Sequence, residues 1–484
     1  MFFLIVLLSL SLCIIWRYLK SKDKTEPPAL SGWLPLIGHG KRFFINGFEF
    51  YRSFEKISEE CLRKGGVVTL YLGFNKVYCV SDPDDCLTVM NMCLEKSMMI
   101  KFAKQFLGNG LFTADVHRWQ TSRKLLNPAF NQKILDSFID IFNNKARELA
   151  NIFATEIGKP FDHQISLRTK NLETICATSF DVHDSESRNI LNQYLPLLAT
   201  LVIKLSQRLQ CFWLHNDFIY SLSSLKRETD EIVKKTKVLC STMIKKNRIM
   251  RLNRASENDA TGKPKKFIDL ILDLSEETDC FTDEQIREES DTVVVGGHDT
   301  SASTLTFAFT LLGSHPHAQQ KLYQEIIRVC GTSDKDVEKQ DLSKLVYTEA
   351  VLKETLRLYP IALLLPRYID RDVKLKNYTL KANSDCFVMA NGLHRHAIWG
   401  EDAEQFRPER WLDKDTLPDA KYYAAFGLGR RSCIGRAYAL MSMKIVVVHV
   451  LRRFSISSDV SKMEVSLSIV SRPERGHSIL LKRR

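Results

Sequence analysis

A single cysteine near the C-terminal end is placed where a thiolate could serve as a ligand. Cys433 lies in the stretch FGLGRRSCIGRAYA, and an apolar run with helical spacing follows over residues 434–451. A thiolate must be stabilised against protonation, and the positive N-terminal end of a helix can do this. Gly429 and Gly435 would let the loop approach a flat cofactor, and Arg431 could pair with an acidic group on that cofactor. The alternative is a buried free cysteine beside a turn.

A second stretch, EESDTVVVGGHDTSAS at residues 288–303, interrupts an apolar helical pattern with polar residues. The adjacent Gly296 and Gly297 weaken a helix locally. The Thr300 hydroxyl can hydrogen-bond back to the carbonyl of Gly296, four residues earlier. This arrangement would open space for a small ligand beside the helix, whereas the structural alternative is a kinked helix in the core.

Two further stretches place charged or aromatic residues on one helix face. Glu354 and Arg357, in YTEAVLKETLRLYP, are three residues apart, and Arg410 in FRPERW could join them. Trp119 and Arg123, in HRWQTSRKLLNPAF, are four residues apart. Taken alone, an ion pair of this kind is common on protein surfaces and contributes little to stability.

Together, the four stretches resemble the motifs of the cytochrome P-450 superfamily, the haem-thiolate monooxygenases. The pattern Phe426-x-x-Gly429-x-Arg431-x-Cys433-x-Gly435 is similar to the haem-binding loop of that family. The resemblance implies that Cys433 is the axial ligand to the iron of haem b. The other residues that it implies in cofactor binding are Trp119, Arg123, Arg367, Phe426, Gly429, Arg431 and Gly435.

The remaining motif residues acquire roles through the same resemblance. Asp299 and Thr300 match the acid–alcohol pair that delivers protons when the family activates dioxygen. Glu354, Arg357 and Arg410 match the Glu-Arg-Arg network that supports the fold beneath the haem, so their implied role is structural.

The segment around Glu289, Asp291 and Thr292, followed by GGHDTSAS, is similar to the microsomal branch that holds the fatty-acid ω-hydroxylases. That branch often has a glutamate, which can form an ester with the haem, where this chain has Gly296. Because Gly296 has no carboxyl group, we expect the haem to be bound non-covalently. The resemblance implies a monooxygenase that inserts one atom of dioxygen into an apolar substrate such as a lipid, a hormone or a xenobiotic.

The implied electron donor is an NADPH-dependent flavoprotein reductase in the membrane, with cytochrome b5 as a further candidate partner. The chain has no convincing G-x-G-x-x-G dinucleotide motif, which agrees with an external donor. Arg430, Arg431 and Arg436 could belong to the docking face. Two alternatives stay open: a haem-thiolate isomerase or dehydratase that needs no electron donor, and a membrane-anchored protein that binds haem or lipid.

The elements that must position these motifs are mainly helical. We expect a mainly α protein with small β-sheets, an α+β class protein with the cytochrome P-450 fold. Most segments between residues 85 and 341 have helical apolar spacing, and a helix is expected over residues 267–274. The polar, basic stretch 244–266 predicts an exposed loop. Strands are expected in a hairpin over residues 67–80, and later over residues 367–391 and 464–484.

The N-terminal region predicts an anchor. MFFLIVLLSLSLCIIW is almost wholly apolar, and basic residues follow it. We expect a signal-anchor transmembrane helix over residues 1–20, a basic and proline-rich linker over residues 21–40 and one catalytic domain over residues 41–484. The charge placement predicts a single pass through the endoplasmic reticulum membrane with the catalytic domain on the cytoplasmic face.

Bulk composition agrees with this organisation. The 484 residues are 44% hydrophobic, which is enough for a large core, and the net charge is +12. A basic surface suits an anionic membrane or an acidic protein partner, and we find no nucleic-acid-binding motif. None of the twelve cysteines forms a C-x-x-C pair, which predicts free thiols in a reducing compartment.

Overall fold

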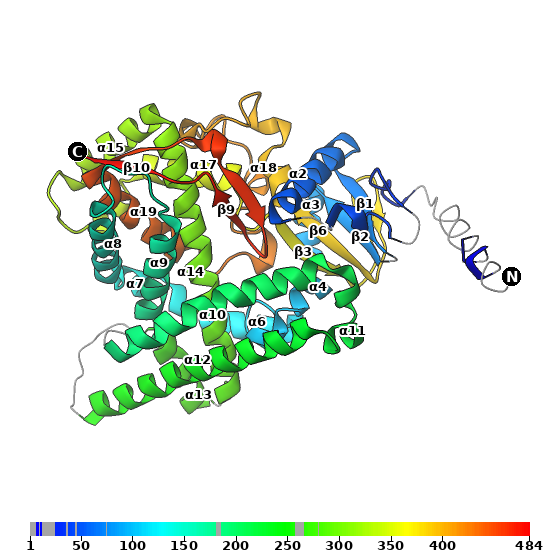
Figure 1. Ribbon diagram of the computed structural model, residues 1–484, viewed down its shortest axis with the longest axis horizontal. Helices are drawn as coiled ribbons and strands as arrows, with labels where there is room; N and C mark the ends of the chain where they lie inside the picture. The colour runs from blue at the N-terminus through cyan, green and yellow to red at the C-terminus, as the bar shows by residue number, and fades with distance from the viewer. Residues whose placement is uncertain are drawn as a thin grey trace.

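The computed structural model describes residues 6–8, 10–11, 25–34, 37–43, 46–73, 75–180, 185–256, 266–278 and 280–484. Helices dominate these residues and small sheets accompany them, which confirms the expected mainly α fold (Figure 1). The helices are α2 (Gly47–Arg63), α3 (Pro83–Met92), α4 (Met98–Lys101), α5 (Lys104–Leu107), α6 (Val116–Leu126), α7 (Gln132–Asp136), α8 (Ile139–Ala154), α9 (Gln164–Phe180), α10 (Ser185–Gln210), α11 (Asp217–Ser221), α12 (Ser224–Ser256), α13 (Phe267–Thr278), α14 (Asp283–Ser314), α15 (Pro316–Cys330), α16 (Lys339–Leu342), α17 (Val346–Leu358), α18 (Ala390–His394) and α19 (Arg436–Arg453).

The larger sheet has four strands in the order β1-β2-β6-β3. Strands β1 and β2 form the predicted antiparallel hairpin, with Val67 opposite Val80. Strand β2 pairs in parallel with β6, and β6 pairs in antiparallel with β3. The strands of the structure are β1 (Val67–Leu72), β2 (Asn75–Val80), β3 (Leu364–Ile369), β4 (Val373–Lys374), β5 (Thr379–Leu380), β6 (Ser384–Met389), β7 (Phe454–Ser457), β8 (Glu464–Leu467), β9 (Ser471–Arg475) and β10 (Leu480–Arg483).

The C-terminal segment does not form a single strand pair. Strands β8 and β9 pair with each other, whereas β10 pairs with β7, which lies before the stretch that the sequence indicated. Strand β3 carries Arg367, which faces Cys386 of β6 across the sheet register. The late strands therefore both complete the fold and deliver one of the expected cofactor residues.

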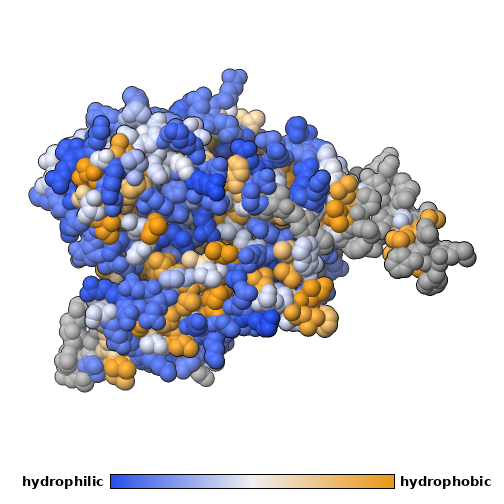
Figure 2. Space-filling view, in the orientation of Figure 1, coloured by the Kyte–Doolittle hydropathy of each residue, from blue (hydrophilic) through white to orange (hydrophobic). Residues whose placement is uncertain are grey.

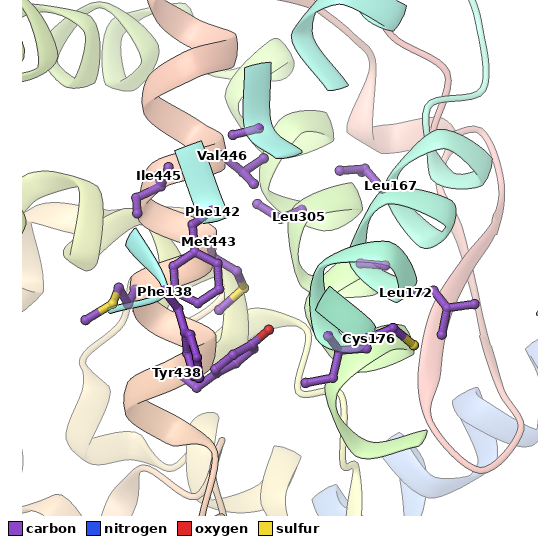
Figure 3. Packing of buried hydrophobic residues seen from close by; sticks show 14 of the residues in the cluster. Phe138, Phe142, Leu167, Leu172, Cys176, Leu305, Tyr438, Met443, Ile445 and Val446 are labelled. Atoms are coloured by element: carbon purple, nitrogen blue, oxygen red, sulfur yellow. The ribbon is translucent and has the colours of Figure 1, made fainter. Parts of the chain in front are cut away.

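The main core lies where α8, α9, α14 and α19 pack together (Figure 3). Phe142 from α8, Leu172 from α9, Leu305 from α14 and Ile445 from α19 are all almost completely buried there. Because α14 and α19 are buried on all sides along much of their length, this packing fixes how the two helices lie relative to each other. These two helices carry or follow the motifs around Thr300 and Cys433.

Helix α14 crosses the middle of the molecule (Figure 1). Its first turn is fixed by a capping box, in which the Thr282 side chain accepts from the Gln285 N–H and the Gln285 side chain accepts from the Thr282 N–H. The helix continues through Gly296 and Gly297 to Ser314 without interruption. Packing on several sides therefore outweighs the low helix propensity of the two glycines.

The expectation of an exposed loop over residues 244–266 is wrong for its first half. Helix α12 continues to Ser256, and residues 257–265 lie outside the described residues. Arg248 pairs with Asp283 at 2.5 Å and Arg251 pairs with Asp273 at 2.6 Å, so the basic side chains hold the helix against its neighbours. Polar composition alone does not separate such a helix from a loop. The helix expected over residues 267–274 is confirmed as α13.

The expected membrane anchor falls mainly outside the described residues. In the described part of the chain, no helix combines the length and the apolarity that a bilayer crossing needs. Part of the expected linker packs on the sheet. The Leu30 N–H donates to the Thr69 carbonyl at 2.8 Å, and Gly38 forms an isolated antiparallel β-bridge with Leu72. These contacts extend the folded unit ahead of residue 41.

Candidate functional site

Cys433 lies in a tight loop just before α19. The backbone N–H of Cys433 donates to the carbonyl of Phe426 at 2.8 Å, which closes the loop. Gly427 and Gly429 have φ values of 77° and 64°, a conformation that favours glycine. Gly435 instead has φ −87°, and α19 begins one residue later at Arg436, two residues beyond the start that the sequence pattern suggested. The loop therefore presents Cys433 ahead of a helix N-terminus.

The Cys433 thiol is solvent-exposed, although protein surrounds it closely. Desolvation by burial raises the pKa of the thiol, while the Gly435 backbone and the Arg123 and Arg436 guanidinium groups act in the opposite direction. The protein alone thus keeps the sulfur protonated at neutral pH. A metal ion bound to the sulfur would deprotonate it outright, so this accessible, otherwise unused thiol fits the axial ligand of a haem iron.

A group of cationic side chains, Arg431, Arg367 and Lys96, gathers near this loop. Among the described residues none of the three forms an ion pair with a carboxylate, although Glu95 and Asp115 lie close enough to Arg431 for their charges to act on it. Arg431 lies over the Trp119 ring at 4.5 Å from its centroid and donates to the Ala114 carbonyl at 3.0 Å. Its Nε and Nη1 atoms are buried and have no hydrogen-bond partner among the described residues. The Nε atom of buried Arg367 also has no hydrogen-bond partner among the described residues. Donors left without acceptors are costly in a protein interior, and the two propionates of haem b would satisfy them.

Burial is the main reason that the pKa values of these cations are lowered, and nearby cations add to the effect on Arg431 and Lys96. Burial, and then the proximity of Arg367, lowers the pKa of Arg431 to about 10, and burial lowers that of Arg367 to about 10. Burial together with Arg367 and Arg431 lowers the pKa of Lys96 well below its usual value. Lys96 belongs to no sequence motif, so only the folded chain reveals it as a third cation that a dianionic cofactor would neutralise.

The two predicted residues of α6 take different positions. Trp119 is buried beneath Arg431. Arg123 donates from Nη1 to the Ser432 carbonyl at 2.9 Å and from Nε to the Asn127 side chain at 2.9 Å. Arg123 therefore holds the loop beside Cys433, whereas Arg431 and Arg367 form the cationic group.

The open stretch of α14 is confirmed in its local geometry. The Thr300 hydroxyl donates to the Gly296 carbonyl at 2.8 Å. A Cβ placed on Gly296 would meet no atom within 4 Å, whereas a Cβ on Gly297 would lie 2.7 Å from the Cδ1 atom of Ile175 in α9. The two glycines therefore differ in purpose: Gly296 borders open space, and Gly297 allows α9 to pack closely.

Asp299 is directed toward α9. Its Oδ1 atom lies 3.0 Å from the Nε atom of Arg168, and the carboxylate is buried. Arg472 of β9 is close enough for the Asp299 charge to affect it. The neighbouring His298 is buried, and burial lowers its pKa to about 4, so its imidazole is neutral at physiological pH. The structure thus places the two members of the acid–alcohol pair in adjacent positions but engages the acid with an arginine.

Glu354, Arg357 and Arg410 form one buried network. Arg357 donates to both Glu354 oxygens at 2.9 Å, and Arg410 donates to Oε1 at 2.9 Å. The Glu354 and Arg357 side chains are 0% exposed, so the surface ion pair that the spacing alone would suggest is excluded. Trp411 adds a fourth member by donating its indole N–H to Glu354 at 2.9 Å. Arg357 also donates to backbone carbonyls of the segment before Arg410, which ties α17 to that segment.

Comparison with known proteins identifies the family. The family model described as Cytochrome P450 matches residues 27–481. The chain is 30% identical to "Cytochrome P450 4V2" of Mus musculus, covering 99% of this chain and 94% of that protein. It is 30% identical to the Homo sapiens protein of the same description, with 98% and 94% covered. It is 27% identical to "Cytochrome P450 4c3" of Drosophila melanogaster, with 95% and 89% covered.

These comparisons agree with the three features of the site. The Cys433 thiol could bind iron, the cationic group could bind propionates, and the open face of α14 could admit a small ligand. Within the described residues no three His, Cys, Asp or Glu side chains are grouped to hold a metal ion by themselves. The chain therefore belongs to the cytochrome P450 family, and it is a haem-thiolate monooxygenase with haem b as its cofactor.

Proposed function

We propose that the protein is a membrane-bound monooxygenase that oxidises an apolar small molecule with electrons from an NADPH-dependent flavoprotein reductase. The open face of α14 at Gly296 carries the proposal. Val293 and Val295 precede this position on α14, are partly buried and pack against the main core. Apolar walls beside a proton-carrying hydroxyl suit an apolar substrate and dioxygen.

The chain's own residues supply binding and proton handling. Bound haem would supply the oxygen chemistry, to which a thiolate ligand donates electron density. Cys433 supplies that ligand, while Arg431, Arg367 and Lys96 would hold the propionates. Thr300 would hold a proton at its hydroxyl, which the Gly296 carbonyl orients. Asp299 would supply protons from the side of the helix that faces Arg168.

The proposed substrate class rests on the shape of the site at Gly296. Gly296 leaves free the space that a larger side chain would fill next to Thr300. We therefore propose that the site accepts lipids, hormones or xenobiotics that are branched or cyclic near the carbon that is oxidised. Haem bound without a covalent bond to α14 fits the same position, because Gly296 offers no carboxyl group.

The electron donor would dock over Cys433. Arg430 and Arg436 are exposed on either side of the cysteine loop, which suits an acidic partner such as the reductase or cytochrome b5. An Arg430→Glu variant should slow reductase-driven turnover and leave peroxide-driven turnover unchanged. Unchanged reductase-driven turnover would place the docking face elsewhere.

We further propose that the endoplasmic reticulum membrane holds the protein, with the catalytic domain in the cytoplasm. Exposed apolar side chains around α11 support this location: Phe218 is 72% and Leu222 is 73% exposed, and Trp213 of the preceding turn η3 (Phe212–His215) is 45% exposed. Apolar residues gather over the α10–α11 region in Figure 2. A patch of this kind suits contact with lipid.

A reductase-coupled screen of lipid and xenobiotic panels tests the proposal most broadly. We expect product that contains one added oxygen atom and forms only when NADPH, reductase and dioxygen are all present. Product that forms without NADPH and reductase would instead support an isomerase or dehydratase. Haem binding without substrate-dependent NADPH consumption would support a binding protein.

A further inference from the structure

Glu289 is a buried carboxyl group that the proposed reaction does not use. It lies on α14 two turns before Gly296, and the residue is 0% exposed. Its Oε2 atom accepts from the Leu111 N–H at 2.8 Å, and the Ser122 hydroxyl of α6 interacts with the same carboxyl group. Its Oε1 atom is buried without a well-formed hydrogen bond among the described residues. One side chain thus joins three segments: α14, α6 and the loop that precedes α6.

The loop before α6 is seated directly on α14. A Cβ on Gly110 would lie 2.6 Å from the backbone carbonyl oxygen of Glu288, and Gly108, whose Cβ would meet the Glu288 side chain, has φ 57°. Only glycine allows the loop to approach the helix this closely. Leu111 follows immediately, so its N–H reaches Glu289 because the glycines have brought the loop there.

Helix α6 also carries the residues that the proposed haem site needs. Ser122 is buried and lies between Trp119 and Arg123 in sequence. Trp119 supports Arg431, and Arg123 holds the loop at Ser432. A change in how α6 sits on α14 would therefore move both contacts.

We propose that Glu289 is a positioning residue whose ionisation loosens α6 and its preceding loop from α14, and thereby weakens the hold on haem. The inference rests on the proposed role of α6 in haem binding. Two hydrogen bonds do not offset the burial of a full negative charge in this setting, whereas the protonated carboxyl group can be buried at lower cost.

The charged groups that face Glu289 are Arg118 of α6 and Glu288 of α14 itself. The pKa of Glu289 is raised from 4.5 to about 7. Burial is the largest cause and the Glu288 charge adds to it, whereas the Leu111 N–H, the Ser122 hydroxyl and Arg118 act in the opposite direction. A carboxyl group whose pKa is raised in the docked state favours docking when it is protonated. Docking is therefore strongest at low pH and weakens as the pH rises through about 7.

The test is the rate of haem transfer from the haem-loaded full-length protein to excess apomyoglobin, between about pH 6 and about pH 8. The shift from 4.5 to about 7 predicts release about tenfold faster at the higher pH. Glu289→Gln, which is neutral at every pH, should release haem slowly throughout and lose this pH dependence. Ser122→Ala should move the midpoint upward, because the hydroxyl stabilises the carboxylate.

Glu288→Gln is the matched control on the neighbouring residue. It should keep the pH dependence and move the midpoint downward, because it removes a like charge. A Glu289→Gln variant that keeps the wild-type pH dependence of haem release would overturn the inference. An unchanged midpoint of that pH dependence in Ser122→Ala would also overturn it. The Ser122→Ala result stays informative if Glu289→Gln fails to fold. Trp119→Ala separates the role of α6 in haem binding from the control of α6 by Glu289. This variant should release haem faster at every pH, and an unchanged release rate would overturn the role of α6 itself.

Discussion

The glycines around Cys433 illustrate how residues of one motif can meet different physical demands. Gly429 has φ 64°, and a Cβ there would lie 2.9 Å from the Met90 carbonyl oxygen. Gly435 has φ −87°, and the nearest atom to its Cβ would be the Cys433 sulfur at 3.9 Å. The first glycine is required by the backbone and its neighbour, whereas the second has room for a methyl group.

Gly429→Ala should therefore destabilise the loop by about 1–3 kcal/mol, because it combines left-handed strain with a clash against fixed backbone. Gly435→Ala should change stability by less than about 0.5 kcal/mol. Thermal unfolding and the ratio of haem to protein absorbance would measure both effects. An equal loss of thermal stability in the haem-free forms of the two variants would show that crowding at position 429 is not the cause.

Removing the Thr300 hydroxyl should uncouple NADPH consumption from product formation without unfolding the protein. Thr300→Ala removes the hydroxyl that the Gly296 carbonyl orients, so product per NADPH should fall by about tenfold or more while peroxide release rises. Thr304→Ala is the matched control, since its hydroxyl makes the same kind of bond, to the Thr300 carbonyl at 2.8 Å, one turn further along α14. Comparable uncoupling in both variants would contradict a specific role for Thr300.

Local spacing in the sequence was sufficient to predict some contacts of the site residues. The other contacts depend on how distant segments pack together. The bond from Thr300 to Gly296 depends on one helical turn, so the sequence predicts it directly. Lys96 reaches Arg367 and Arg431 only because a loop, a strand and the cysteine loop converge. The direction of Asp299, toward Arg168, likewise depends on how α9 packs on α14, which no local pattern contains.

At the scale of elements, the network around Glu354 joins α17 to the segment that ends at Trp411. Glu354→Ala would leave Arg357 buried without its counter-charge, and it would leave Arg410 with Asp402, at 3.3 Å, as its remaining carboxylate partner. We expect a loss of about 3–5 kcal/mol in the free energy of unfolding. Denaturant-induced unfolding of the haem-loaded protein would measure it.

Glu156→Ala is a suitable control, because its partner Lys159 is 65% exposed and the pair lies on the surface. That variant should lose less than about 1 kcal/mol. A loss of similar size in Glu156→Ala and Glu354→Ala would contradict the structural role of the buried network. The sequence predicted the three charged members of this network, but not Trp411, because an indole N–H beside a carboxylate leaves no spacing signal.

Element boundaries were less predictable than element types. The hairpin over residues 67–80 and helix α13 match the sequence pattern, because turn residues and apolar periodicity mark them clearly. Helix α12 extends further than its polar composition suggests, since ion pairs with Asp283 and Asp273 stabilise it from outside. Strand β10 pairs with β7 and not within its own segment, a choice that depends on the whole chain.

At the scale of the whole molecule, the exposed apolar residues of α11 predict how the protein sits on a bilayer. Leu222 beside α11 is 73% exposed and Leu252 near the far end of α12 is 71% exposed. Along a straight helix these positions would be about 40 Å apart. An environment-sensitive dye at Leu222 should shift to shorter wavelength when the full-length protein is reconstituted into vesicles, whereas the same dye at Leu252 should not. Equal shifts, or none at Leu222, would contradict this orientation.

The central claim is that the sulfur of Cys433 is the anionic axial ligand of haem iron, and one absorbance measurement tests it most directly. The reduced, carbon-monoxide-saturated protein should show the long-wavelength band that is specific to thiolate ligation. Cys433→Ser should lose that band and its turnover, while a cysteine away from the site, such as Cys280→Ser, should keep both. A Cys433→Ser variant with the wild-type spectrum and activity would contradict the account.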